Sequence, residues 1–257
     1  MFSLHGKITV ITGASSGIGR AAAERFAKAG SNIVIACRRD VSDFAKNIGA
    51  RWIRTDVGIE REVKACMDQA ADLFGRIDVL INNAGYWGCS ADLEEASEDE
   101  FDRNFQINAK GPFFGIKHAS RHMPRGSSII TTTSLASVIG LPGYGAYTAA
   151  KFAASGLLKC AAMELGPKGI RVNEISPTSV DTPMLRNQDS AEAEIAMTST
   201  ASALGRIVQP EEVAALMHFL ASDDCGAISG QQIVVDCGQT AGCSVASMNA
   251  WLGASNA

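Results

Sequence analysis

Short β-branched runs alternate along this chain with longer helical patterns. The runs lie at residues 7–12, 32–37, 50–55, 77–82, 127–134, 170–176 and 231–236. The helical patterns lie near 17–29, 60–74, 98–122, 147–166 and 210–222. Such alternation is typical of parallel βαβ units. The first four runs are mostly apolar, as expected when helices cover both faces of a sheet. The sequence therefore predicts an α/β fold with a doubly wound parallel sheet of about seven strands.

The 257 residues are enough for one α/β domain with a substantial core. No linker, low-complexity tract or repeat divides residues 1–257, so we expect a single domain. Residues 183–205 are less regular and follow a predicted strand. Long excursions at strand ends often cover ligands, so we expect a substrate-covering segment there, with a plain surface insertion as the alternative. Residues 240–257 are weakly patterned and are expected to form a C-terminal tail or a subunit contact.

Composition excludes several classes of function. The formal charge is −4 and basic residues do not cluster, so a nucleic-acid partner is not expected. No apolar run suits a signal peptide or a membrane span. The seven cysteines are scattered, odd in number and without a CxxC pair. They are interpreted as reduced thiols, with no metal site, which favours a cytoplasmic location.

A glycine-rich turn lies between the first strand and the first helix, in "ITVITGASSGIGR". Glycine permits a tight turn and a close backbone approach to a pyrophosphate. The start of the following helix offers unpaired N–H groups to the anion. The turn therefore predicts a dinucleotide site whose contacting residues are Gly13, Ser15, Ser16, Gly17, Ile18 and Gly19.

The end of the second strand bears on which dinucleotide is bound. An acid there would bind the ribose 2′-hydroxyl of NAD(H), but this chain has Cys37 followed by Arg38. A guanidinium binds a 2′-phosphate well, so NADP(H) is favoured. The alternative is NAD(H), with Asp40 serving the ribose and the arginines merely exposed. Asp56 and Val57, just after the third strand, are candidates to contact adenine.

Tyr147 and Lys151 lie four residues apart in a predicted helix and therefore project from one face. A free tyrosine titrates near pKa 10, and a nearby ammonium group lowers that pKa. The pair is suited to general acid–base chemistry, such as proton transfer to a carbonyl oxygen during hydride delivery.

Three further features accompany this pair. "NNAG" at 82–85 ends the fourth strand, where a ligand crevice opens in such sheets. Asn108 lies inside a helical pattern, where it is either functional or a solvent-facing or locally bonded side chain. Ser134 ends the fifth strand and is placed to bind a substrate oxygen, although neighbouring hydroxyls in "TTTSLAS" are alternatives.

Together these motifs resemble the short-chain dehydrogenase/reductase family, from about residue 4 to about residue 240. The resemblance includes "TGASSGIG", "NNAG", "YTAAK" and "RVNEISP" in the expected order. It implies a Rossmann-type sheet with strand order 3-2-1-4-5-6-7, an oxidoreductase activity and a homotetramer.

The resemblance also implies roles for individual residues. Tyr147 matches the general acid/base, and Lys151 matches the residue that holds the nicotinamide ribose and lowers the tyrosine's pKa. Ser134 matches the residue that orients the substrate oxygen, and Asn108 matches one that anchors a water in a proton relay. The other implied cofactor contacts are Asn83, Ala84, Gly85, Pro177, Thr178 and Thr182.

Two positions depart from the family pattern. Thr178 follows Pro177 where glycine is usual, which is expected to narrow the nicotinamide end or alter cofactor posture. Ser16 lies where NADP-preferring members often have a basic residue, which weakens the NADP(H) preference without reversing it.

The substrate candidates are mostly aromatic or aliphatic: Tyr86, Trp87, Leu141, Tyr144 and Met184. No Lys or Arg cluster accompanies them, although Arg186 is near. An apolar pocket with a few hydroxyls suits a neutral ketone or secondary alcohol.

Two alternatives stay open. A fatty-acid-type 3-oxoacyl thioester reductase would need a basic surface for a carrier protein, formed by Lys110, Lys117, Arg121 and Arg125. A non-catalytic NADP(H)-binding redox sensor is the other, although the four expected catalytic residues are all in place.

Overall fold

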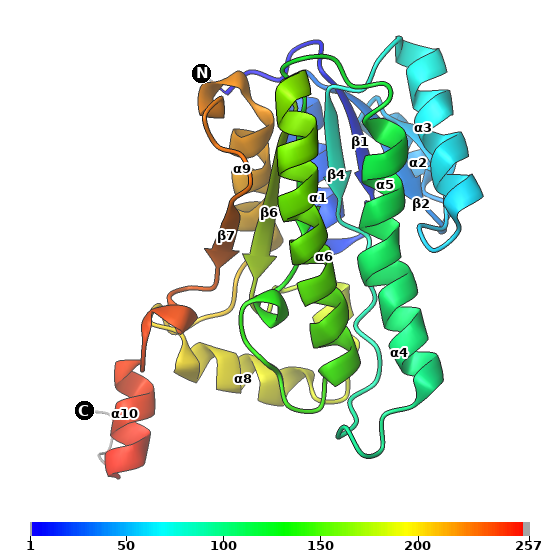
Figure 1. Cartoon of the computed structure of the whole chain (residues 1–257). Coiled ribbons are helices and arrows are strands. Elements are labelled where there is room, and N and C mark those ends of the chain that lie inside the picture. Colours follow the sequence, from blue (N-terminus) through cyan, green and yellow to red (C-terminus); the bar gives the residue numbers. More distant parts are fainter. Residues whose placement is uncertain (1, 254–257) are drawn as a thin grey trace.

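The computed structural model describes residues 2–253, in which one parallel sheet has the strand order β3-β2-β1-β4-β5-β6-β7 (Figure 1). Its strands are β1 (Ile8–Thr12), β2 (Asn32–Cys37), β3 (Arg51–Arg54), β4 (Val79–Asn82), β5 (Ser128–Thr132), β6 (Arg171–Pro177) and β7 (Gln232–Val235). The order changes direction between β1 and β4, which is where ligands bind in open α/β sheets. The predicted fold class and strand order are confirmed.

Helices cover both faces of the sheet (Figure 1). One face packs against α1 (Gly17–Lys28), α2 (Ser42–Asn47) and α9 (Pro210–Ala221). The other packs against α3 (Glu60–Phe74), α5 (Gly111–Ala119) and α6 (Gly145–Leu165). Within β1, Val10 faces the second group and Ile11 the first, and both are fully buried. Each such side chain stabilises the fold by about 1.5–3 kcal/mol, which accounts for the apolar central strands.

The predicted helix over 98–122 is interrupted. α4 (Glu98–Asn104) is followed by a π-helical segment, η1 (Phe105–Lys110), before α5 begins. Asn108 lies within η1 and is buried, so its side chain does not face solvent. π-Helical turns inside helices are frequent at functional sites.

Two segments that the sequence leaves without regular structure contain helices. Residues 183–205 include α7 (Pro183–Arg186) and α8 (Ala191–Ala201). The predicted tail includes α10 (Val245–Leu252), which projects from the rest of the chain in Figure 1 and exposes Val245, Trp251 and Leu252. The final part of that tail, 254–257, lies outside the described residues.

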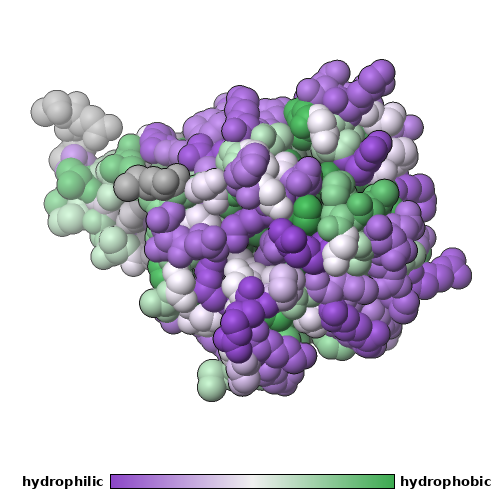
Figure 2. All heavy atoms as spheres, turned by 90° about the horizontal axis from the view of Figure 1, so that it is seen from above, coloured by the Kyte–Doolittle hydropathy of each residue, from purple (hydrophilic) through white to green (hydrophobic). Residues whose placement is uncertain are grey.

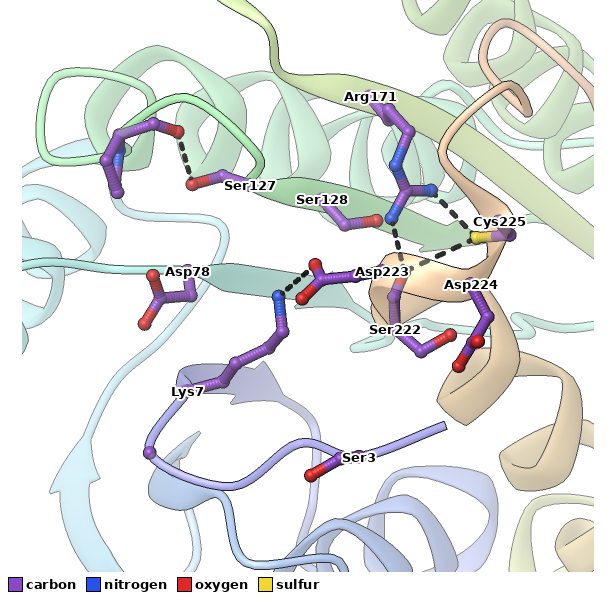
Figure 3. A network of polar contacts seen from close by, with 12 residues as sticks. Ser3, Lys7, Asp78, Ser127, Ser128, Arg171, Ser222, Asp223, Asp224 and Cys225 are labelled. Atoms are coloured by element: carbon purple, nitrogen blue, oxygen red, sulfur yellow. Dashed lines mark hydrogen bonds and ion pairs between the residues drawn. The ribbon is translucent and has the colours of Figure 1, made fainter. Parts of the chain in front are cut away.

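A buried arginine joins the amino end of β6 to the end of α9 (Figure 3). Arg171 donates hydrogen bonds to the carbonyl oxygens of Leu220 and Ser222, at 2.8 and 3.0 Å. Its other terminal nitrogen lies 3.1 Å from Sγ of Cys225, in η4 (Asp223–Cys225). Because this network is at the opposite end of the strand from Pro177, it holds the sheet rather than the site.

Figure 2 shows one face of the molecule, on which polar side chains predominate. Within residues 2–253, every helix is too short or too polar to cross a bilayer. In the same residues, no three His, Cys, Asp or Glu side chains are grouped to hold a metal ion.

Candidate active site

A cavity of about 950 Å³ opens at the carboxyl ends of the strands. It brings together almost every site residue that the sequence predicts, from Gly13 in the first turn to Thr182 after β6. Two predicted residues do not line it, Gly19 and Asn108. Gly19 instead packs behind the turn, where an added Cβ would lie 2.5 Å from Nδ2 of Asn83. The need for glycine at position 19 is therefore explained by packing inside the protein.

The β1–α1 turn forms one end of the cavity. Gly13 and Gly17 have φ values of +70° and +55°, which side chains disfavour. A Cβ on Gly13 would lie 2.6 Å from Cα of Ala84, so this glycine also lets the turn contact the loop after β4. Helix α1 begins without a side-chain hydrogen bond from its N-cap, Ser16. Since Ser16, Gly17 and Ile18 line the cavity, these features fit the pyrophosphate of a dinucleotide.

The cavity continues past the end of β2, where Arg38 and Arg39 line it. The side chain of Arg38 is 63% exposed, and its Nη1 lies 3.9 Å from Oδ2 of Asp56. Asp40 is exposed, does not line the cavity and accepts a hydrogen bond from the Ser42 N–H at 2.9 Å. The basic pair, and not Asp40, therefore borders the cavity.

Tyr147 and Lys151 lie on successive turns of α6, and both are buried. Burial raises the pKa of Tyr147 to about 12, against an opposing effect of the Ser134 hydroxyl, while Glu194 raises it further. The sequence predicts the opposite direction for this pKa, and that prediction is wrong for this structure. The reason is that desolvation of the phenolate outweighs its favourable interactions.

Lys151 is held beside the phenol rather than at its oxygen. Its Nζ donates a hydrogen bond to the carbonyl oxygen of Thr132 at 3.1 Å and lies 5.5 Å from the centre of the Tyr147 ring. Burial lowers the pKa of Lys151 to about 8, and the carboxylate of Glu174 opposes this shift. Glu174 is itself buried in β6 and accepts a hydrogen bond from Ser155, one turn beyond Lys151.

Asn108 organises the loop after β4 from behind the cavity. Its Oδ1 accepts the N–H of Tyr86 at 3.0 Å, and its Nδ2 donates to the Tyr86 carbonyl at 2.7 Å. A Cβ placed on Gly85 would be 3.4 Å from this Oδ1 and 3.9 Å from Nζ of Lys151. Gly85 therefore lies between the Asn108 amide and Lys151, and Asn108 itself does not border the cavity. Its predicted role toward a water stays a prediction.

Aromatic side chains line the cavity around Tyr147. The Trp87 ring packs against Tyr144 and Tyr147, with centroids 4.4 and 4.6 Å apart. Nε1 of Trp87 is buried and has no hydrogen-bond partner within residues 2–253. Leu141 and Met184 also line this region.

Tyr86 borders the cavity, but its side chain is held by α4. Its hydroxyl donates to Oε1 of Glu100 at 2.7 Å, and the Arg103 guanidinium lies 4.3 Å from the ring centre. The Tyr86 hydroxyl is therefore paired with Glu100, and the predicted substrate contact of the Tyr86 side chain stays a prediction.

The segment 183–205, expected to cover a substrate, contributes several lining residues that the sequence does not single out. They lie on α8 and on its connection to α7: Gln188, Ser190, Ala193, Glu194, Met197 and Thr198. A single acid among small residues carries no sequence signal for a site, so Glu194 could be found only from the tertiary structure. The hydroxyl of Thr178 donates to Oε1 of Gln239 at 2.6 Å, which turns this unusual side chain toward η5 (Gln239–Ala241).

Comparisons with known proteins agree with this geometry. Residues 13–240 match the family model described as enoyl-(acyl carrier protein) reductase. The chain is 40% identical over 248 residues to momilactone A synthase of Oryza sativa subsp. japonica, covering 91% of this chain and 90% of that protein. It is 35% identical over 240 residues to a mitochondrial borneol dehydrogenase of Lavandula x intermedia, covering 91% of each.

A bacterial relative, trans-4-hydroxycyclohexanecarboxylate dehydrogenase of Sinomonas cyclohexanicum, is 36% identical over 250 residues, covering 92% of this chain and 93% of that protein. Among solved structures, a dehydrogenase/reductase from Sinorhizobium meliloti 1021 superposes with a TM-score of 0.85 at 33% identity. That match covers 93% of this chain and 96% of the other. The chain therefore belongs to the short-chain dehydrogenase/reductase family, whose members are oxidoreductases that use NAD(H) or NADP(H).

Proposed function

We propose that this protein is an NADP(H)-preferring oxidoreductase that interconverts a neutral ketone and a secondary alcohol. The observation that carries the proposal is the placement of Ser134, Tyr147 and Lys151 in the same cavity as the uncapped start of α1. One cavity therefore offers an anion-binding end and a proton-donating end.

The chain's own residues supply binding and proton transfer. The bound dinucleotide supplies the hydride for reduction and accepts it in oxidation. The hydroxyls of Ser134 and Tyr147 hold the substrate oxygen, and Tyr147 gives its Oη proton to that oxygen as the carbonyl becomes an alcohol. Because the pKa of Tyr147 is raised to about 12, the phenol is protonated at neutral pH, as reduction requires. Lys151 keeps a positive charge beside the ring.

The preference for NADP(H) rests on the end of β2. Arg38 and Arg39 border the cavity, while Cys37 occupies the position at which an acid would bind an NAD ribose. Asp40, the alternative acid, lies away from the cavity wall. A guanidinium favours a dianionic 2′-phosphate.

The preference for a neutral substrate rests on the aromatic and aliphatic wall formed by Trp87, Leu141, Tyr144 and Met184. One relative is the dehydrogenase of a neutral alcohol, borneol. The alternative of a thioester reductase needs a basic surface for a carrier protein, and two of its lysines are already bound within the chain. Lys117 pairs with Glu60 at 2.7 Å, and Lys110 donates to Gln106 at 2.9 Å.

For its assembly we propose a homotetramer, supported by apolar side chains that α6 and α10 expose, including Phe152, Met163 and Trp251. A cytoplasmic location is supported by the seven free thiols, which suit a reducing compartment.

The proposal is tested by NADPH and NADH oxidation with a panel of neutral cyclic ketones. Tyr147→Phe should lose at least about 100-fold in kcat, the usual contribution of a general acid, and keep its affinity for NADPH. An active Phe variant would contradict the role of Tyr147. Tight NADPH binding without turnover of any carbonyl or alcohol would favour the redox sensor instead.

A further inference from the structure

The substrate end of the cavity contains one carboxylate. Among the described residues that line the cavity, the Asp, Glu, Lys and Arg side chains are Arg38, Arg39, Asp56, Lys151 and Glu194. The first three lie at the adenosine end, and Lys151 is bound to the Thr132 carbonyl. Glu194, on α8, is left as the charged group that faces a substrate.

The Glu194 carboxylate is fixed by its neighbours. Its Oε1 accepts a hydrogen bond from Oγ of Ser179 at 2.7 Å, and that hydroxyl lies 3.1 Å from Oγ1 of Thr198. Within residues 2–253, its Oε2 has no hydrogen-bond partner. Glu194 also raises the pKa of Tyr147, as expected for a negative charge near the phenol. One oxygen thus anchors the group, and the other is available to a ligand in the cavity.

We propose that Glu194 determines substrate specificity by rejecting compounds that carry a carboxylate and accepting their neutral counterparts. This inference rests on the proposed function and assigns its charge selectivity to one side chain. A substrate carboxylate would place a second negative charge in a partly desolvated cavity, where like charges repel more strongly than in water. A neutral substrate avoids this repulsion, and a hydroxyl or amide on it can donate to Oε2.

Family membership does not decide this point. The relatives named above include the dehydrogenase of an acid, hydroxycyclohexanecarboxylate, and that of a neutral alcohol, borneol. The position of Glu194 in the cavity assigns this chain to the second class.

The test compares two substrates of matched shape, 4-oxocyclohexanecarboxylate and 4-oxocyclohexanecarboxamide. We expect wild-type kcat/KM to favour the amide by at least about tenfold, the factor given by about 1.4 kcal/mol. Glu194→Gln, which keeps the bond from Ser179, should remove most of this preference by raising kcat/KM for the acid. Glu192→Gln is the matched control, because this substitution removes the same charge from the same helix. The Glu192 side chain is 87% exposed and does not line the cavity.

The outcomes separate the two proposals. Equal wild-type use of acid and amide, or an unchanged preference in folded Glu194→Gln, would overturn the inference and leave the proposed function standing. If neither ketone is reduced, calorimetry measures the binding of each ketone to the NADPH-loaded protein. Tighter binding of the amide that is lost in Glu194→Gln would support the role of Glu194. Equal binding of the two ketones would overturn it. Glu194→Ala serves as the second variant if melting shows that the Gln protein is unfolded.

Discussion

The ammonium nitrogen of Lys151 lies 3.1 Å from the carbonyl oxygen of Thr132, which fixes it at the end of β5 beside the Tyr147 ring. The lysine is buried, and this burial lowers its pKa to about 8. A lysine is charged below its pKa, so the positive charge beside the phenol is present at neutral pH and is lost above about pH 8.

Ketone reduction should therefore slow as the pH rises through about 8. Tyr147, whose pKa is raised to about 12, stays protonated over this range, so the change reports Lys151. The measurement is kcat/KM for a neutral ketone between pH 5 and pH 10 with saturating NADPH. A profile that stays flat to pH 10 would show that the lysine charge is not needed.

Glu174→Gln should move the alkaline decrease in kcat/KM to lower pH. The buried carboxylate of Glu174 raises the pKa of Lys151 against the effect of burial, so neutralising it lowers that pKa further. Glutamine retains an acceptor for the Ser155 hydroxyl. The control is Glu164→Gln, because Glu164 is exposed and lies on α6, the helix that carries Lys151. This substitution should leave the pH of the decrease unchanged. If kcat/KM decreased at the same pH in the wild type and in Glu174→Gln, the effect of Glu174 on the pKa of Lys151 would be contradicted.

Arg38→Ala should weaken NADPH selectively. Loss of a charged hydrogen bond of roughly 1.5–3 kcal/mol corresponds to about a 10- to 150-fold higher KM for NADPH, with little change for NADH. The control is Arg54→Ala, because the Arg54 side chain is also 63% exposed but does not border the cavity. Equal losses for both cofactors would indicate that Arg38 does not bind the 2′-phosphate.

Arg171→Ala should destabilise the protein without altering the turnover of folded molecules. It removes the hydrogen bond to the carbonyl oxygen of Ser222 (Figure 3) and the one to the carbonyl oxygen of Leu220. Because hydrogen bonds to charged groups contribute roughly 1.5–3 kcal/mol, we expect a loss of about 3 kcal/mol in the free energy of unfolding. Urea denaturation measures it, with exposed Arg61→Ala expected to change stability by less than about 0.5 kcal/mol. A similar small change for Arg171→Ala would refute its structural role.

The order of strands and helices, and the pairing of Tyr147 with Lys151, are predictable from the sequence because both depend on local periodicity. A four-residue spacing on a helix puts two side chains on one face wherever the helix lies. The glycine turn is equally local, although the packing of Gly19 against Asn83 is not.

Tertiary structure alone decided the rest, since it depends on residues far apart in the chain. The approach of Glu194 to Tyr147, the bond between Thr178 and Gln239 and the placement of Glu174 behind Lys151 require the folded sheet and its covering helices. The pKa of Tyr147 shows why: the sequence pairs it with a lysine and predicts a decrease, whereas burial raises it. Desolvation is set by the packing of the whole chain around a group, and no local pattern records it.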